Sequence, residues 1–279
     1  MNTQNLTRVS SEQVRKMQLE LLSQLDSFCH DNEITYYAFA GTLLGTVRHQ
    51  GFIPWDNDID VAVSREDYIR MRALLANEDS HPCFRFLCYE NDRNYLWQHG
   101  RIVMKHTYMK TARGYEKLGL SIDIFPLDSQ GDDYDEARRN LAEIRQCVRL
   151  RIMSYDKKDN KTVRYPDCTE QERAELQRLF EYEGIDDEEY WVKRHITLAQ
   201  RFNDGAQSRY YGCNSNDKYA VVCERRFFSG STLLPFENTM IPVPSGYEEI
   251  LRLYYGDYRQ LPPKEKQTGV KEMEIYLTE

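Results

Sequence analysis

The stretch from Phe39 to Val63 reads FAGTLLGTVRHQGFIPWDNDIDVAV, and it decides the fold. It joins a glycine turn at Gly41, a basic and aromatic connector, and an acidic cluster that runs into an apolar segment. In that cluster Asp58 and Asp60 alternate with apolar residues, so a β-strand here would place both carboxylates on one face. Two neighbouring anions repel unless a cation lies between them. The pattern therefore indicates a metal site that handles phosphate, with Mg²⁺ as the natural ion.

A second apolar run, from Leu120 to Phe125, carries a single acidic residue, Asp123. An unpaired charge in a buried strand is costly, so this residue should have a partner or a chemical role. A glycine turn, a D-x-D strand and a later strand aspartate, in this order, resemble the parts of the nucleotidyltransferase (polymerase-beta-like) fold. We therefore expect Asp123 to lie within side-chain reach of Asp58 and Asp60.

At these residues a narrower resemblance emerges. The run from 41 to 68, GTLLGTVRHQGFIPWDNDIDVAVSREDY, is similar to the signature of the LicD family of phosphocholine transferases, whose distant animal relatives are fukutin and fukutin-related protein. SIDIFPLD (121–128) resembles the second block of that family, and Phe236-Glu237, VPSGYEEIL (243–251) and YGDYRQLPP (255–263) resemble its C-terminal block. Asn57 departs from the pattern, because many members carry Asp there, but the acidic pair on either side of Ile59 is kept.

The resemblance implies a chemistry and its participants. The donor would be a CDP-alcohol, with CDP-choline first, and the acceptor a hydroxyl of a cell-surface glycan such as lipopolysaccharide or teichoic acid. Asp58, Asp60 and Asp123 would be the catalytic carboxylates and the ligands of Mg²⁺, with Mn²⁺ as an alternative ion. Asp123 would complete the metal site or accept the proton of the attacking hydroxyl.

Five further residues are candidates for substrate binding, each with a structural alternative. Gly41 and Thr42 begin a turn that can present backbone N–H groups to phosphate, while Thr42 could equally cap a helix. Arg48 suits bidentate phosphate binding. Trp55 would line a pocket or simply pack, and Arg101 would reach phosphate or lie on a solvated strand face.

Composition and charge narrow the class of protein. The 279 residues include 37 Lys and Arg against 45 Asp and Glu, a formal charge of −8, which argues against a general nucleic-acid binder. Seven cysteines without a C-x-x-C pair support neither a disulfide framework nor a zinc ribbon. No apolar run approaches the length of a transmembrane helix and no signal-peptide pattern is present, so we expect a cytoplasmic protein, with peripheral membrane association left open.

The periodicity predicts an α+β fold with a nucleotidyltransferase-like core. The expected strands of one mixed sheet are 34–40, 58–63, 82–89, 95–110 and 120–125. Residues 1–130 would form this catalytic core. Residues 131–279 would form a mainly helical insert and a C-terminal cap that shapes the acceptor site.

Two other functions fit the same carboxylates. A nucleotidyltransferase would move a nucleoside monophosphate from a triphosphate and release pyrophosphate, whereas the LicD reading predicts release of CMP. A non-catalytic glycan-binding protein on the same fold would bind neither Mg²⁺ nor a cytidine nucleotide.

Overall fold

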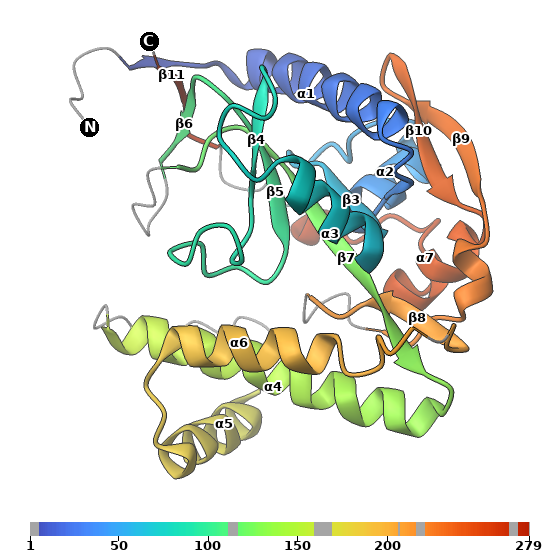
Figure 1. Cartoon of the computed structure of the whole chain (residues 1–279). Coiled ribbons are helices and arrows are strands. Elements are labelled where there is room, and N and C mark those ends of the chain that lie inside the picture. Colours follow the sequence, from blue (N-terminus) through green and yellow to red (C-terminus); the bar gives the residue numbers. More distant parts are fainter. Residues whose placement is uncertain are drawn as a thin grey trace. The chain divides into compact units, whose positions relative to one another are not determined.

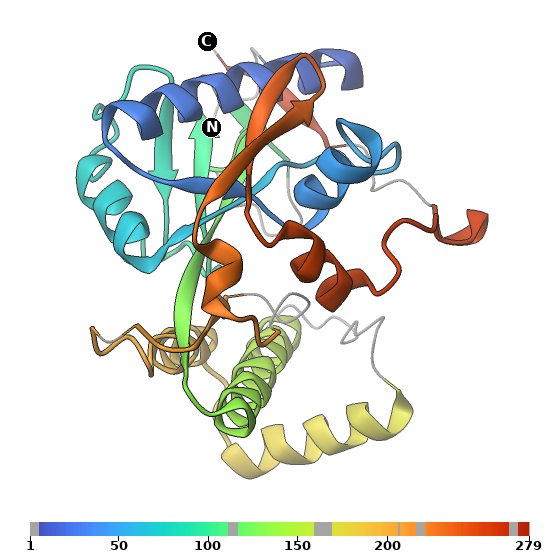
Figure 2. The same cartoon turned by 90° about the vertical axis from the view of Figure 1, so that its right-hand side faces the viewer.

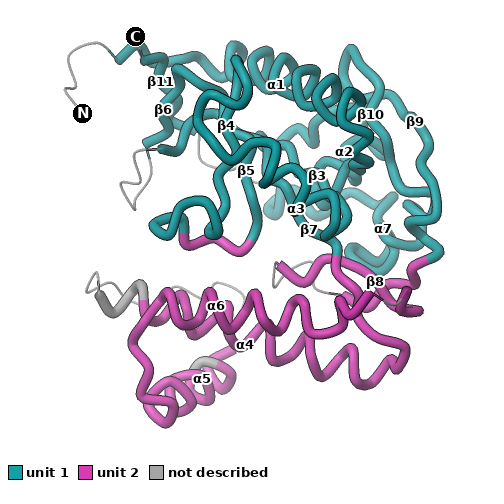
Figure 3. The backbone as a smooth tube through the Cα atoms, viewed as in Figure 1, with its two compact units in different colours: residues 1–95, 99–127, 226–279 teal, residues 96–98, 128–225 magenta. Residues whose placement is uncertain are grey.

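The computed structural model describes residues 6–110, 117–158, 169–205, 207–215, 221–267 and 273–278. The chain divides into two compact units (Figure 3). Unit 1 comprises residues 1–95, 99–127 and 226–279, and unit 2 comprises residues 96–98 and 128–225. Six of the seven cysteines lie in the described part of the chain and all six are free thiols.

A mixed sheet with the strand order β2-β3-β7-β5-β4 forms the centre of unit 1 (Figure 1). Its strands are β2 (Tyr36–Ala38), β3 (Asp60–Ser64), β4 (Phe84–Leu87), β5 (Gly100–Met104) and β7 (Ser121–Gly131). β3 and β7 pair in parallel, while the other pairs along this order are antiparallel. The α+β class and the mixed sheet predicted from the sequence are thus confirmed.

The bounds of all five expected strands differ from those in the structure, and two of these differences have a clear consequence. The expected strand 95–110 is two strands, β5 and β6 (Thr107–Met109), because His106 adopts a left-handed backbone conformation with φ of +58° in the turn between them. The expected strand 58–63 begins only at Asp60. Asp58 therefore lies in the segment before the strand, where its side chain is exposed to solvent.

Four α-helices accompany the sheet of unit 1: α1 (Ser11–Asp31), α2 (Ala40–His49), α3 (Arg65–Leu74) and α7 (Tyr247–Tyr255). Ser10 caps α1 through a capping box with Gln13, and Ser64 caps α3 by accepting the N–H of Asp67. α2 contacts β2, β3 and α7, and Figure 2 shows α2 and α7 on the same side of the β9–β10 hairpin.

The C-terminal part of the chain returns to unit 1. β9 (Ser231–Phe236) and β10 (Thr239–Pro244) form a hairpin, and β10 contacts β2. β1 (Thr7–Arg8), β11 (Ile275–Leu277) and β6 form a separate small sheet. The described part of this stretch also contains short 3-10 helices at Arg225–Phe228 and Lys264–Lys266. The sequence division at residue 130 thus differs from the compact units, because the residues after 225 pack with the sheet.

Unit 2 is mainly helical, with α4 (Tyr134–Lys158), α5 (Glu170–Glu183) and α6 (Glu188–Ala199), and β8 (Tyr210–Cys213) pairs with β7. Its core is apolar and is built from these helices: Leu141, Ile144, Cys147, Leu150, Met153, Leu176, Phe180, Trp191, Leu198 and Ala199. Arg151 and Glu188 form a buried ion pair at 3.0 Å. Helices are present in this stretch as expected, while its place as an insert and its role at an acceptor site stay predictions.

Gly45 allows the closest backbone approach in the segment that leads to the acidic cluster. A Cβ at this position of α2 would collide with the carbonyl oxygen of Gly51, which cannot move as a side chain could. We expect Gly45→Ala to lower the free energy of unfolding by about 1–3 kcal/mol in urea titrations. Gly230→Ala is the matched control, because a Cβ there meets open space, and it should change stability by less than about 0.5 kcal/mol. Equal stabilities of the two variants would contradict the tight contact.

Candidate active site

The register of two parallel strands brings the predicted carboxylates together. Asp60 on β3 pairs directly with Asp123 on β7, although 63 positions separate them in the sequence. The Asp123 N–H donates to the carbonyl of Ile59 at 2.9 Å, which extends the pairing toward Asp58. The prediction that Asp123 lies near the acidic pair is confirmed. The prediction that Asp58 shares a strand with Asp60 is wrong. The segment from Asp56 to Ile59 precedes β3, which begins only at Asp60.

Burial and mutual repulsion, in that order, raise the pKa values of the acidic pair. Asp60 is 8% exposed, and its pKa is raised well above the usual value by burial and then by Asp58, Asp123 and Asp56. The pKa of Asp58 is raised to about 7, first by burial of the carboxylate and next by Asp56 and Asp123. Its side chain keeps solvent-accessible surface, which weakens the first of these causes. Both carboxylates are therefore poorly stabilised as anions by the protein alone.

Asp123 has the opposite environment. Arg101 lies across from it on β5 and engages both carboxylate oxygens, with Nε 2.7 Å from Oδ1 and Nη2 donating to Oδ2 at 3.1 Å. His99 Nε2 is also 3.1 Å from Oδ2. Burial works against the charge of Asp123, but these two neighbours outweigh it and hold the pKa at about 2. The buried charge predicted to need a partner has one.

His99 is the residue of this site that the sequence analysis missed. It is 8% exposed, and its ring lies against Phe125 with centroids 4.6 Å apart. A sequence signal existed, because His99 precedes Arg101 by two positions and side chains at that spacing share one face of a strand. The sequence alone did not say which strand this face would oppose.

Gly41 and Thr42 position the carboxylates from the first turn of α2. Any side chain on Gly41 would collide with Oδ2 of Asp56, so glycine lets that carboxylate approach the helix start. The Thr42 hydroxyl accepts the N–H of Asp60 at 2.8 Å and fixes the start of β3. Ala40, the first residue of α2, has a φ of +46°, a strained conformation for a residue with a side chain. Phe39, the residue before α2, makes no side-chain cap hydrogen bond, so the N–H groups of the first turn lack a side-chain cap there.

Arg48 lies at the other end of α2, and Trp55 contacts the residue next to it. Arg48 is in the last turn of α2, about 12 Å along the axis from Ala40. Its Nη1 donates to the carbonyls of Tyr258 and Gln260 at 3.0 and 3.3 Å, and its Nε to His49. The Trp55 ring makes an edge contact with His49. The structure therefore shows packing contacts for both residues, and their roles in substrate binding stay predictions.

The residues present fit a divalent metal in a restricted way. Among the described residues, no group of three or more His, Cys, Asp or Glu side chains is arranged to hold a metal ion, since Asp123 is engaged by Arg101 and His99. Asp58 and Asp60 offer oxygen ligands only. Their raised pKa values indicate that a nearby cation would stabilise the ionised carboxylates. Mg²⁺ is commonly held by one or two carboxylates together with substrate phosphates and water. The pair fits that kind of site, and a role of Asp123 as third ligand stays a prediction.

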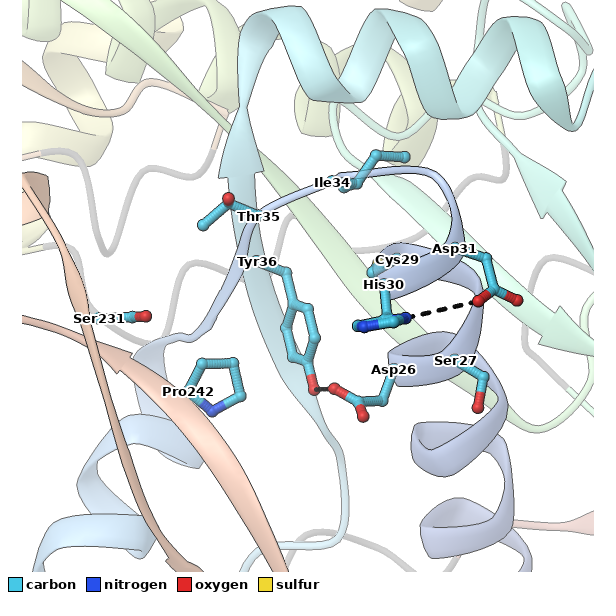
Figure 4. A pocket seen from close by; sticks show the side chains of 10 residues that line it. All are labelled: Asp26, Ser27, Cys29, His30, Asp31, Ile34, Thr35, Tyr36, Ser231 and Pro242. Atoms are coloured by element: carbon cyan, nitrogen blue, oxygen red, sulfur yellow. Dashed lines mark hydrogen bonds and ion pairs between the residues drawn. The ribbon is translucent and has the colours of Figure 1, made fainter.

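A pocket of about 480 Å³ lies elsewhere in unit 1, beside the start of β2 (Figure 4). The end of α1 and the β9–β10 hairpin contribute residues to it, and the Tyr36 hydroxyl donates to Asp26 within it at 2.8 Å. Tyr36 pairs with Val63, three residues beyond Asp60, or about 10 Å along the strand. No predicted site residue lines this pocket.

Comparison with known proteins shows which proteins this chain is similar to. The family model described as "LicD/FKTN/FKRP, nucleotidyltransferase domain" matches residues 33–145. The chain is 29% identical over 271 residues to a lipopolysaccharide cholinephosphotransferase LicD of Haemophilus influenzae, covering 95% of this chain and 98% of that protein. It is also 37% identical over 76 residues to an uncharacterised protein of Rickettsia prowazekii, covering 24% of this chain and 29% of that one.

The ionised Asp60 carboxylate should lower the stability of the folded protein at neutral pH. Its folded-state pKa lies above that of the unfolded chain, so the free energy of unfolding decreases as the pH rises from about 4 through the folded-state pKa. We expect Asp60→Asn to be more stable than the wild type at neutral pH, by a margin that shrinks toward pH 4. Urea unfolding at several pH values measures this margin. The control is Asp128→Asn, which weakens a 2.6 Å hydrogen bond from Asn203 and should cost about 1 kcal/mol. A destabilised Asp60→Asn would show that the carboxylate has a structural role.

The Arg101–Asp123 pair should behave as a buried ion pair. Removing the cation in Arg101→Met leaves an uncompensated carboxylate, so we expect a loss of about 3–5 kcal/mol. The wild-type pair contributes stability that is present above about pH 4 and is lost as the pH falls toward 2, and the variant should lack this acid dependence. The double variant Arg101→Met, Asp123→Leu should recover much of the loss. Stability in Arg101→Met equal to that of the wild type would contradict the pairing.

Proposed function

Because the chain belongs to the LicD family, whose relative in Haemophilus influenzae is a transferase, we propose that it transfers phosphocholine from CDP-choline to a hydroxyl of a cell-surface glycan, with release of CMP. The observation that carries this proposal is the similarity over 95% of the chain to a lipopolysaccharide cholinephosphotransferase. The cluster of Asp58 and Asp60 beside Asp123 supplies the site where such a phosphate transfer would occur.

In the proposed reaction the acceptor hydroxyl attacks the phosphorus that bears choline. A new bond forms between the acceptor oxygen and this phosphorus, while the bond from the phosphorus to the bridging oxygen of CMP breaks. The proton of the hydroxyl passes to a base or to water, and CMP carries away the electron pair. Asp58 and Asp60 would hold Mg²⁺ or Mn²⁺, which neutralises charge on the donor diphosphate and on the leaving group when it is bound.

The protein's own residues divide the remaining tasks. The uncapped N–H groups at Gly41 and Thr42 can donate to a donor phosphate, and the helix dipole favours an anion there. Asp123, with a pKa of about 2, is a weak proton acceptor near neutral pH, so metal binding suits it better than general-base catalysis. For that role the ion would have to replace one of its contacts with Arg101 or His99. Arg101 keeps positive charge beside the phosphates.

Where the protein acts is part of the same proposal. Within the described ranges, no helix is both long and apolar enough to cross a bilayer. We propose that the enzyme works in the cytoplasm, where CDP-choline would be available, and reaches a lipid-linked acceptor at the membrane surface.

The bond that breaks separates this function from nucleotidyl transfer. We expect incubation with Mg²⁺, a glycan acceptor extract and CDP-choline to yield CMP and a phosphocholine-modified glycan. CTP in place of CDP-choline should give no product. Asp58→Asn, the negative control, should lose more than about 100-fold in turnover, since changes around metal ligands alone often cost 10- to 100-fold. Pyrophosphate and a nucleotidylated glycan formed from CTP would instead establish nucleotidyl transfer. The absence of any reaction, together with the absence of cytidine-nucleotide binding, would favour a glycan-binding protein.

A further inference from the structure

A polar residue interrupts the buried stripe of α1. The stripe is otherwise apolar and consists of Val14, Leu21, Leu22, Leu25 and Cys29. Gln18 lies in the middle of it and is 0% exposed. A buried amide lowers stability unless its donors and its acceptor are hydrogen-bonded. An amide at this position is therefore expected to make a specific contact that leucine could not make.

Gln18 makes one described hydrogen bond, and that bond reaches the acidic cluster. Its Nε2 donates to the carbonyl of Asn57 at 2.7 Å. Its Oε1 is buried and accepts no hydrogen bond from the residues that the structure describes. A core position thus keeps a polar side chain, at a cost of about 1–3 kcal/mol for an unsatisfied acceptor, in order to hold a single carbonyl.

Apart from Gln18, the segment that contains this carbonyl has local support, and the nearest hydrogen bond to the sheet is the one that Ile59 accepts from the Asp123 N–H. Asp58 lies outside β3, so no strand pairing fixes it. Two other bonds of the segment are local: the Asp56 N–H donates to Ile53, and the Asn57 N–H donates to Oδ1 of Asp56. Gln18 ties the segment to a long helix, 39 positions earlier in the chain. By contrast Asp60 is fixed through β3 and through Thr42.

We infer that Gln18 is a positioning residue: its amide fixes the Asp56–Asp58 segment through the carbonyl of Asn57 and thereby holds the Asp58 carboxylate beside Asp60. This inference rests on the proposed function in one respect, since the use of that geometry is to bind a divalent cation. Gln18 itself touches neither carboxylate. Its effect should appear in metal affinity and in the mobility of the segment, and only through them in turnover.

Gln18→Met tests this, because methionine has a similar length and no hydrogen-bonding amide. Leu25→Met, on the same stripe two turns away, is the matched control for core packing. We expect Gln18→Met to unfold at a temperature equal to or above that of the wild type, since the unsatisfied Oε1 is removed. Its affinity for Mn²⁺, measured by calorimetric titration of the protein alone, should fall about 10- to 100-fold. Leu25→Met should bind Mn²⁺ as the wild type does.

Two further measurements make the outcome decisive. Amide hydrogen exchange at Asn57, Asp58 and Ile59 should accelerate in Gln18→Met and not in Leu25→Met. In the transfer assay kcat should fall while the KM for the glycan acceptor stays unchanged. Gln18→Leu provides a second apolar variant if the first does not fold. Wild-type Mn²⁺ affinity and wild-type exchange in a folded Gln18 variant would overturn the inference. A wild-type protein that binds no Mn²⁺ would instead overturn the proposed metal role, and the exchange data would still decide whether Gln18 fixes the segment.

Discussion

Repulsion among the carboxylates of Asp58, Asp60 and Asp123 is the constraint on which this part of unit 1 depends. Like charges a few ångströms apart in a poorly solvated environment cost several kcal/mol, so each needs compensation. Asp123 receives it from Arg101 and His99 and remains ionised with a low pKa. Asp58 and Asp60 do not receive it to the same extent, and their pKa values rise. The protein therefore stabilises one of its three site carboxylates as an anion and leaves the other two suited to a cation supplied from outside.

The C-terminal part of the chain supports this site from a distance. Glu237, in the turn of the β9–β10 hairpin, accepts the Phe52 N–H at 2.9 Å and donates its own N–H to the Gln50 carbonyl at 2.8 Å. Arg48 holds the carbonyls of Tyr258 and Gln260. The end of α2 and the start of the connector to the acidic cluster are thus fixed by residues 185 to 212 positions later in the chain. This gives a physical reason why the C-terminal sequence blocks accompany the first block: they hold the loop that delivers Asp58 and Asp60.

The sequence predicted what depends on local pattern and missed what depends on which strands become neighbours. The mixed sheet and the closeness of Asp123 to the acidic pair followed from periodicity and from the cost of a lone buried charge. The pairing of β5 with β7 could not be seen, so the ion pair of Arg101 with Asp123 was not predicted and His99 was not noticed. Arg48 was a candidate for phosphate binding because of its place in the first sequence block, and the sequence could not show that it also holds two carbonyls near the C-terminus. Its role toward phosphate stays a prediction. The exit of Asp58 from the strand escaped for a similar reason, because alternation continues across a boundary set by tertiary contacts.

The two carboxylates proposed to bind the metal are held by different kinds of structure. Asp60 belongs to a strand with parallel and antiparallel neighbours, so moving it requires opening the sheet. Asp58 belongs to a segment outside the sheet, and such a segment can open locally at a much lower free energy. A metal site built from one rigid and one adjustable ligand can accept a bulky donor diphosphate before closing on it. The affinity of such a site then depends on how firmly the adjustable ligand is held, which is why a buried amide on α1 can control chemistry that it does not touch.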